Sequence, residues 1–219
     1  MDDRRLIAHA SDFIAFVYVA RQEYALARQP LQEALAIYQS LGDENRCGGT
    51  QAFIGDTYYL EGRLEEAQAF YEAGLRAFQS AGNDNYLTYA TRRLGYVHLL
   101  LGDWEQSRAF FSESLELNLL LRERQGVASC LEAFANLAYY SGELERAARL
   151  YGAAANVLDA YHTSLILVDG YIWDQVLPQL RQSLGEEAFQ RAWAVGYALS
   201  LNEAVAYAER QAGDSPSPY

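Results

Sequence analysis

The sequence predicts an all-α fold: a right-handed superhelical solenoid of four helix hairpins of about 40 residues each, followed by a C-terminal helical cap. The first observation is a repeat, because residues 62–71 return at 102–111 and at 142–151, and a weaker copy stands at 22–31. The second is that the apolar residues of each period fall on one face of each of two helices. The third is that small residues face large ones at fixed spacing, as closely stacked helices require.

The second period shows the predicted hairpin most clearly. Its first helix carries Ile54 and Tyr58 one turn apart, and Gly62 then breaks the helix. Its second helix carries a stripe of residues on one face: Leu64, Ala67, Tyr71, Leu75 and Phe78. Turn-forming residues at 79–84 are expected to end the hairpin.

Equivalent positions in the four periods predict how the helices pack. On the first helices a large residue precedes a small one, in the pairs Ile14-Ala15, Ile54-Gly55, Leu94-Gly95 and Phe134-Ala135. On the second helices a small position holds Ala27, Ala67, Ser107 and Ala147. A large position one turn later holds Leu31, Tyr71, Phe111 and Tyr151. A further close-packing position holds Ala34, Gly74, Ser114 and Ala154.

The predicted domain organisation follows from the period. The repeat domain, residues 1–165, contains hairpins at about 8–47, 48–87, 88–127 and 128–165. In the first hairpin Gln22 replaces the turn glycine, and Pro30 is expected to kink the second helix or delay its start. The third joint has no glycine before Gly126, so we expect a longer helix there.

Residues 166–211 are predicted to form a helical cap that belongs to the same domain. A loop is expected at 161–170, with its apolar residues folded back onto the stack, and Pro178 is expected to kink or restart the helix that follows. Gly185 ends that helix and a second helix follows. Because each end of a solenoid exposes an apolar face that must be covered, this segment is expected to pack on the fourth hairpin.

The end of the chain carries one local signal and one compositional signal. Ser200 and Glu203 have the spacing of a capping box, which predicts a last short helix that starts after Ser200. Residues 212–219 contain glycine, serine and proline and no apolar pattern, so we expect a disordered tail.

The repeated positions resemble the tetratricopeptide repeat. In the second period the resemblance rests on Ile54, Gly55, Tyr58, Gly62, Leu64, Ala67, Tyr71, Gly74 and Leu75. In the third it rests on Leu94, Gly95, His98, Gly102, Trp104, Ser107, Phe111, Ser114 and Leu115. The usual repeat has about 34 residues, so these units are longer, and the proline that often ends a unit is missing. The resemblance implies that the first helices line a concave surface.

A second resemblance concerns the C-terminal part of the chain. It rests on residues 184–189, Ala192-Trp193, Gly196 and residues 199–205, after repeats of about 40 residues. These residues look like the carboxyl-terminal region of large bacterial signalling ATPases, the STAND-type regulators, often LuxR-like or SARP-like transcription factors. In those proteins the repeat region senses or scaffolds. No Gly-x-x-x-x-Gly-Lys-Ser/Thr phosphate loop is present, so we interpret the chain as a stand-alone repeat protein or an excised piece of such a regulator.

Composition excludes several classes of function. The 219 residues are 51% apolar and 21% charged, which indicates a globular chain. A net charge of −12 argues against direct binding to nucleic acid or to anionic membranes. No uninterrupted apolar window reaches about 18 residues, and the apolar run after Arg5 is interrupted by His9 and Asp12, so we expect neither a membrane span nor a signal peptide. Cys47 and Cys130 indicate thiols in a reducing compartment, and we predict a cytoplasmic protein.

The sequence offers no catalytic residues, no cofactor and no metal site. His9, His98 and His162 lack metal-ligand spacing, and His98 stands where neighbouring units have tyrosine. The paired acids at 65–66 and 186–187 lie at helix starts, where they favour the helix dipole. The sequence therefore predicts that the protein is not an enzyme.

A face of the first helices is the candidate partner-binding site. Its residues are Asp12, Phe16, Asp56, Tyr59, Tyr89, Arg92, Tyr96, Glu132, Asn136, Tyr139 and Tyr140. Aromatic residues and arginine are favoured at binding surfaces, although the same rings can also pack between adjacent first helices. We predict a non-catalytic scaffold that binds a protein or peptide, or adjacent domains of a larger regulator, and a homo-oligomer is compatible with this.

The acids in this set favour a basic or apolar partner helix over a free carboxylate. The alternative is a small-molecule-sensing domain with an aromatic pocket around Tyr96 and Tyr139.

Overall fold

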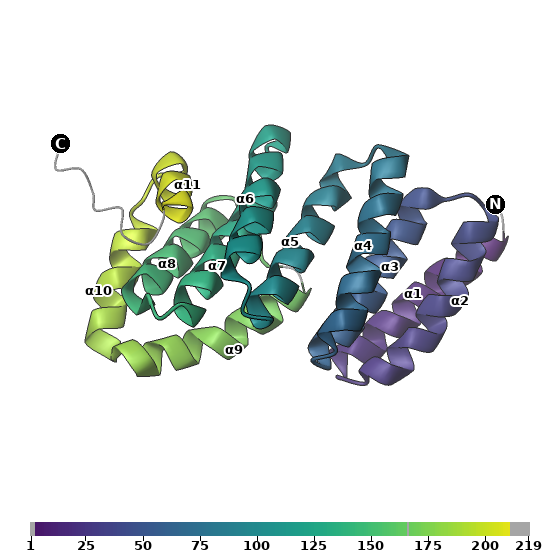
Figure 1. Ribbon diagram of the computed structural model, residues 1–219, viewed down its shortest axis with the longest axis horizontal. Helices are drawn as coiled ribbons and strands as arrows, with labels where there is room; N and C mark the ends of the chain where they lie inside the picture. The colour runs from purple at the N-terminus through teal and green to yellow at the C-terminus, as the bar shows by residue number, and fades with distance from the viewer. Residues whose placement is uncertain (1–2, 166, 211–219) are drawn as a thin grey trace. The chain divides into compact units, whose positions relative to one another are not determined.

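The computed structural model describes residues 3–165 and 167–210. Within these residues the chain forms eleven helices and no strands (Figure 1). The helices are α1 (Asp3–Ala20), α2 (Tyr24–Ser40), α3 (Glu44–Leu60), α4 (Leu64–Ala81), α5 (Asp84–Leu100), α6 (Trp104–Leu121), α7 (Arg124–Tyr140), α8 (Leu144–Ala160), α9 (Leu167–Leu184), α10 (Glu186–Tyr197) and α11 (Leu201–Glu209). The predicted all-α fold class is confirmed.

The chain divides into two compact units, with the boundary between Leu117 and Asn118. This boundary lies inside α6, and the domain limits given by the sequence stay predictions. The predicted tail at 212–219 lies outside the described residues. No helix in the described ranges is long and apolar enough to cross a membrane.

The turns between helices recur every 20 residues and share one backbone conformation. Glycines in the left-handed region stand at 42, 62, 82, 102 and 142, with φ between 63° and 84°. Gln22, Arg122 and His162 occupy the same region at the remaining positions, with φ of 60°, 58° and 51°. Each turn thus reverses the chain after a helix of 17 or 18 residues.

This regularity corrects the prediction of a longer helix at the third joint. Helix α6 ends at Leu121, because Arg122 takes the left-handed conformation that glycine takes in the other turns. The pattern-based expectation failed because a non-glycine residue filled a glycine position.

Two prolines are accommodated inside helices. Helix α2 begins at Tyr24 and runs through Pro30, so its start is not delayed. Helix α9 runs through Pro178 and begins at Leu167, which shortens the loop predicted at 161–170. A proline removes the bond to the residue four positions earlier, here Leu26 and Asp174. Both of these residues are exposed, so water can satisfy the carbonyl group that loses its partner.

The N-terminal unit is built by successive contacts from α1 to α5. The predicted packing positions of α2 and α4 are buried, with Ala27, Leu31, Ala67 and Tyr71 all 0% exposed. A Cβ atom on Gly55 would lie 2.7 Å from the Tyr71 ring, so only glycine allows this approach of α3 to α4. The pairing of small and large residues predicted from the repeat is therefore observed.

Ile14 is the exception, because it is 50% exposed whereas its equivalents Ile54, Leu94 and Phe134 are buried. The side chain of Ile54 packs against Leu31 of the preceding helix. In the described residues no helix of the unit lies opposite the corresponding side of α1, so Ile14 has no equivalent of α2 to pack against.

In the C-terminal unit, α7 and α8 form a hairpin, and α9, α10 and α11 contact it. Helices α8 and α10 approach so closely that a Cβ atom on Gly196 would overlap the carbonyl oxygen of Arg149. Asn156 donates a hydrogen bond to the carbonyl oxygen of Leu199 (3.0 Å), and Tyr197 donates one to Asp159 (2.8 Å). Helix α11 begins at the predicted capping box of Ser200 and Glu203.

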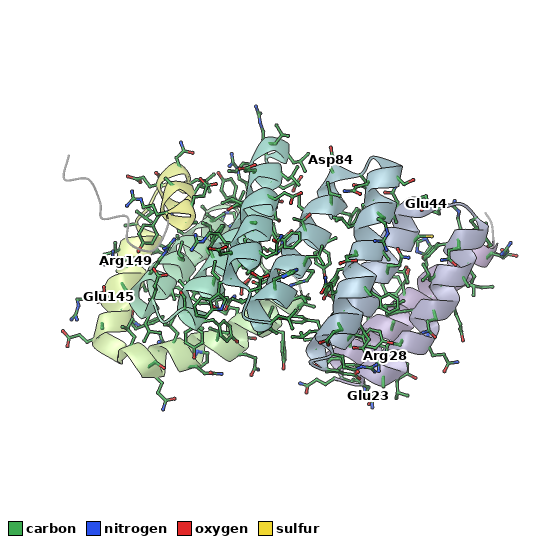
Figure 2. The ribbon with its side chains drawn as sticks, in the orientation of Figure 1. Glu23, Arg28, Glu44, Asp84, Glu145 and Arg149 are labelled. Atoms are coloured by element: carbon green, nitrogen blue, oxygen red, sulfur yellow. The ribbon has the colours of Figure 1, made fainter. Side chains whose placement is uncertain are left out.

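Acidic residues stand in the first turn of many helices, where their negative charge interacts favourably with the positive end of the helix dipole. Glu44, Asp84 and Glu145 occupy these places in α3, α5 and α8, as labelled in Figure 2. Glu145 also pairs with Arg149 one turn later, at 3.5 Å. These acids are therefore explained by helix formation.

Candidate functional site

The candidate residues lie on the first helix of each hairpin. In the N-terminal unit α1 carries Asp12 and Phe16, α3 carries Asp56 and Tyr59, and α5 carries Tyr89, Arg92 and Tyr96. In the C-terminal unit α7 carries Glu132, Asn136, Tyr139 and Tyr140.

Burial separates these residues into three groups. Six are 9% exposed or less, namely Asp56, Tyr59, Arg92, Tyr96, Glu132 and Asn136. Phe16 and Tyr140 are 47% and 45% exposed. Asp12, Tyr89 and Tyr139 are half-buried. The role of the set in binding a partner stays a prediction, and the surface it offers is centred on the second and third groups.

Asp56 is the centre of a polar cluster in the N-terminal unit, which we call the Asp56 cluster: Asp56, Tyr71, Tyr89 and Arg93. The Tyr71 hydroxyl donates a hydrogen bond to Asp56 Oδ1 (2.8 Å), and the Tyr89 hydroxyl donates one to Oδ2. Arg93 Nε lies 3.3 Å from Asp56 Oδ1. One carboxylate therefore connects side chains from α3, α4 and α5.

Charge and aromatic faces stabilise this cluster. Asp56 and Arg93 are 3% and 0% exposed, so their attraction is poorly screened by water. The Arg93 guanidinium lies 4.7 Å from the centre of the Tyr89 ring, a favourable cation–π distance. Burial, together with the charge of Asp56, raises the pKa of Tyr71 and of Tyr89. Both phenols therefore remain protonated and act as donors.

The C-terminal unit has a counterpart in which the acceptor of the tyrosine is a neutral amide, the Asn136 cluster: Glu132, Asn136 and Tyr151. The Tyr151 hydroxyl donates a hydrogen bond to Asn136 Oδ1 (2.7 Å). Asn136 Nδ2 donates to the backbone carbonyl of Glu132 (3.0 Å) and to its carboxylate. Burial, with a contribution from the charge of Glu132, raises the pKa of Tyr151.

Helix α9 lies close to this second cluster. The ring of Trp173 meets the ring of Tyr151 edge-on, with centres 4.8 Å apart. Tyr139 donates a hydrogen bond to Gln179 Oε1 at 3.3 Å. Part of the predicted binding face of α7 is therefore in contact with the chain's own C-terminal segment.

Asp12 belongs to a smaller polar group in the first hairpin. The Tyr38 hydroxyl donates a hydrogen bond to Asp12 Oδ2 (2.7 Å), and His9 Nδ1 lies 3.2 Å from the same hydroxyl. Burial raises the pKa of Asp12, although the hydrogen bond from Tyr38 opposes this shift. The group links α1 to α2.

Arg93 of the Asp56 cluster was missed by the sequence analysis. Arg93 occupies a position that holds Phe13, Phe53 and Ala133 in the other periods, so an arginine among apolar equivalents was a usable signal. Tyr71 and Tyr151 were predicted as core residues, and both are 0% exposed. The pattern did not predict that their hydroxyl groups donate hydrogen bonds to Asp56 and Asn136, each 15 residues earlier.

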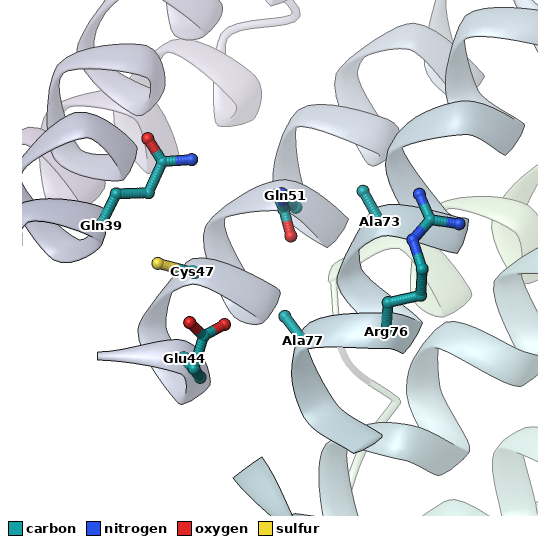
Figure 3. Close-up of a pocket in the computed structure, with 7 residues that line it drawn as sticks. All are labelled: Gln39, Glu44, Cys47, Gln51, Ala73, Arg76 and Ala77. Atoms are coloured by element: carbon teal, nitrogen blue, oxygen red, sulfur yellow. The ribbon is translucent and has the colours of Figure 1, made fainter. Parts of the chain in front are cut away.

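Two cavities of the described chain lie away from these clusters. The first, of about 360 Å³, is lined by Gln39, Glu44, Cys47, Gln51, Ala73, Arg76 and Ala77 (Figure 3). Burial raises the pKa of the Cys47 thiol, which keeps it protonated. The second, of about 450 Å³, is lined by residues of α9 together with Gly185 and Glu186. Neither cavity includes Tyr96 or Tyr139.

The fold defines a helical-repeat protein. The family model described as "Tetratricopeptide repeat" matches residues 5–80 and 86–160. The chain therefore belongs to the tetratricopeptide repeat family, whose members generally mediate protein–protein interaction and are typically non-enzymatic scaffolds.

Relatives among curated proteins match only part of the chain. It is 40% identical over 98 residues to "Putative HTH-type transcriptional regulator Rv0890c" of Mycobacterium tuberculosis, and equally to Mb0914c of Mycobacterium bovis. The match covers 43% of this chain and 11% of each relative. The chain thus spans a small part of the length of these relatives.

One solved structure shows the same fold at low sequence identity. The crystal structure of BtubC (BKLC) from P. vanneervenii has a TM-score of 0.64 and 19% identity, and the match covers 90% of this chain and 84% of that one. A Pseudomonas aeruginosa pilF structure gives a TM-score of 0.40 and 18% identity, over 88% of this chain and 99% of that one. The first of these supports the helical-repeat solenoid class.

Proposed function

We propose that this chain is a non-catalytic protein-interaction scaffold that binds a partner helix or peptide on the faces of its first helices. The observation that carries the proposal is the exposure of Phe16 and Tyr140, at 47% and 45%, on those faces. Large aromatic side chains are frequent among the residues that dominate binding energy. Their polar neighbours Asp12 and Tyr139 are held by hydrogen bonds within the chain, so the surface is preorganised.

The charges favour a partner with basic and apolar residues. Of the acids on this face, Asp12 is half-buried and reaches the surface, whereas Asp56 and Glu132 are buried and Arg93 is already paired with Asp56. The chain as a whole has a net charge of −12. Acidic side chains attract a basic helix and repel a free carboxylate. A helix with lysine or arginine beside leucine or aromatic residues therefore fits this surface best.

We further propose that the chain serves as the repeat arm of a bacterial transcription regulator. The support is its 40% identity over 98 residues to Mycobacterium proteins named "Putative HTH-type transcriptional regulator". The resemblance of residues 184–205 to the C-terminal region of STAND-type regulators, which rests on the sequence alone, points the same way. In that setting adjacent domains of the regulator are candidate partners, and the proposed compartment is the cytoplasm.

The sensing alternative has less support. The ring of Tyr96 meets Phe111 and Tyr59 edge-on, with centres 5.1 Å and 6.3 Å apart. Tyr139 meets Tyr140 in the same way at 5.3 Å. These rings pack on neighbouring side chains, as expected for a protein-binding scaffold whose aromatics also stabilise the stack.

The test is site-specific photo-crosslinking in cells. A photoreactive phenylalanine analogue is placed at Phe16, at Tyr140 or, as a control, at Leu26 of α2, which is also exposed. We expect a discrete protein adduct from Phe16 or Tyr140 and none from Leu26. The adduct's partner is then purified, and Phe16→Ala or Tyr140→Ala should weaken its binding by about tenfold or more.

Equal crosslinking from all three positions would contradict the proposed site. A small molecule that raises the melting temperature strongly in a screen, and loses this effect with Tyr96→Ala or Tyr139→Ala, would favour the sensing alternative.

A further inference from the structure

Helix α1 exposes an unusually apolar face. Leu6, Phe13 and Val17 are 52%, 73% and 54% exposed, and Ala10 between them is also exposed. Ile7 and Ile14 flank this row and are 56% and 50% exposed. The row has spacings of four, three and four residues, which is the spacing of a coiled-coil seam. No charged residue interrupts it.

The same positions in the other first helices are built to meet a neighbouring helix. Cys47 and Ile54, equivalent to Ile7 and Ile14, belong to buried clusters that include Tyr38 and Leu31 of α2. Thr57, Val97 and Leu137, equivalent to Val17, are each 3% exposed or less. The face of α1 thus has the shape and composition of an interhelical contact, but in the described residues no helix lies on it.

We propose that this face binds the same face of a second copy of the chain, with the two α1 helices antiparallel. An antiparallel two-fold pair centred between residues 11 and 12 sets Phe13 of one copy against Ala10 of the other, and Leu6 against Val17. Large residues then meet small or medium ones in every layer, as an isologous contact requires. The face is therefore complementary to itself.

Two further features favour a second copy as the occupant. The overall charge of −12 would oppose self-association, but the seam itself carries no charge. A head-to-tail contact would need the opposite end of the repeat stack, which is the face of α8. In the described residues α10 already packs on α8, so this face is covered. A helix of 18 residues is about 27 Å long, so the pair falls at the low end of stable interface areas. We therefore expect a dimer that dissociates in the micromolar range.

The experiment measures the mass of the 219-residue chain by light scattering and sedimentation between about 1 and 100 µM. We expect a concentration-dependent shift from 24.6 kDa to twice that mass. Phe13→Glu should weaken dimerisation by at least about tenfold, because it places a charge in the central layer. Leu26→Glu, at a similarly exposed leucine of α2, is the matched control and should leave the dimer unchanged.

The pairing itself is tested with cysteine variants. Ala10→Cys in one tagged chain and Phe13→Cys in the other should form a disulfide between the two chains, since the native cysteines are buried. A monomer at all concentrations overturns the proposal, and so does a dimer that Phe13→Glu leaves intact. A dimer that crosslinks between two Phe13→Cys chains, and not between Ala10→Cys and Phe13→Cys, overturns the antiparallel arrangement. Circular dichroism of each variant shows whether a loss of dimer is a loss of fold.

Discussion

The hairpins α3–α4 and α7–α8 share one contact between their helices but differ in the charge of the hydrogen-bond acceptor. In each, a fully buried tyrosine of the second helix donates its hydroxyl to a polar residue of the first helix, 15 residues earlier. The tyrosines Tyr71 and Tyr151 are equivalent in the repeat, as are their acceptors Asp56 and Asn136. The acceptor is a carboxylate in the Asp56 cluster and a neutral amide in the Asn136 cluster.

The difference shows that the charge of the neighbouring side chain determines whether a charged or a neutral acceptor is buried at this position. Asp56 has Arg93 within 3.3 Å, so its charge is compensated. Asn136 instead lies beside the carboxylate of Glu132 and donates a hydrogen bond to it. A second carboxylate there would face a like charge, whereas the amide satisfies both Glu132 and Tyr151. The repeat thus keeps the geometry of the contact and changes its charge to suit the neighbouring side chain.

Removal of the Asp56 carboxylate is expected to have the largest effect on stability, and it tests the difference between the two clusters most directly. Asp56→Ala should lower the free energy of unfolding by about 3–5 kcal/mol, because the buried guanidinium of Arg93 loses its carboxylate partner. Asn136→Ala, which removes a neutral group, should lower it by about 1–3 kcal/mol. Urea unfolding followed by circular dichroism measures both. Equal losses would mean that the charge of Asp56 does not distinguish the two clusters.

Exchange of the neutral acceptor for a charged one tests the same point from the other side. Asn136→Asp should lower the free energy of unfolding by about 2–3 kcal/mol at neutral pH, because a buried carboxylate would face Glu132. The like charge raises the carboxyl pKa in the folded state above its unfolded value, so the variant regains stability as the pH falls through that pKa. Unfolding at pH 7 and at pH 5 measures this, and a loss that grows on acidification would contradict the assignment.

The two tyrosine hydroxyls offer a smaller and sharper contrast. Tyr71→Phe removes a hydrogen bond to a charged acceptor and should lower the free energy of unfolding by about 1.5–3 kcal/mol. Tyr151→Phe removes one to a neutral acceptor and should lower it by about 0.5–1.5 kcal/mol. Phe111, the natural equivalent in the third period, shows that the ring alone fits this position. A larger loss in Tyr151→Phe would reverse the ranking.

The sequence was sufficient for the fold class because the repeat recurs in register. A period of 40 places Ala27, Ala67, Ser107 and Ala147 at one kind of contact, and all four are 0% exposed. Local signals were equally reliable, as the capping box of Ser200 shows. Turn conformation was harder to predict, because Arg122 adopts the left-handed backbone that the pattern associates with glycine.

The candidate site was harder to predict than the fold. The helical period shows which side of a helix a residue occupies, but not whether another side chain covers it. Arg92 and Glu132 lie on the predicted face, yet they are 3% and 0% exposed. Burial of such groups depends on partners from other helices, as Arg93 is to Asp56, and those contacts join residues 37 positions apart. Periodicity alone does not identify such pairs.

The smallest expected effect concerns Asp12, a third acceptor that is only half-buried. Burial raises its pKa above the unfolded value, so the protonated form is favoured by folding, and the stability contributed by this group declines as the pH rises through the folded pKa. Asp12→Asn keeps an acceptor for the Tyr38 hydroxyl and removes this titration. The variant should therefore unfold within about 1 kcal/mol of the parent at neutral pH, with a smaller loss of stability than the parent as the pH rises from acid to neutral. Urea unfolding at intervals between pH 4 and pH 7 measures the difference. If Asp12→Asn lost as much stability as Asp56→Ala, partial exposure would not reduce what a carboxylate contributes to the free energy of unfolding. The contrast between the clusters would then have a cause other than burial.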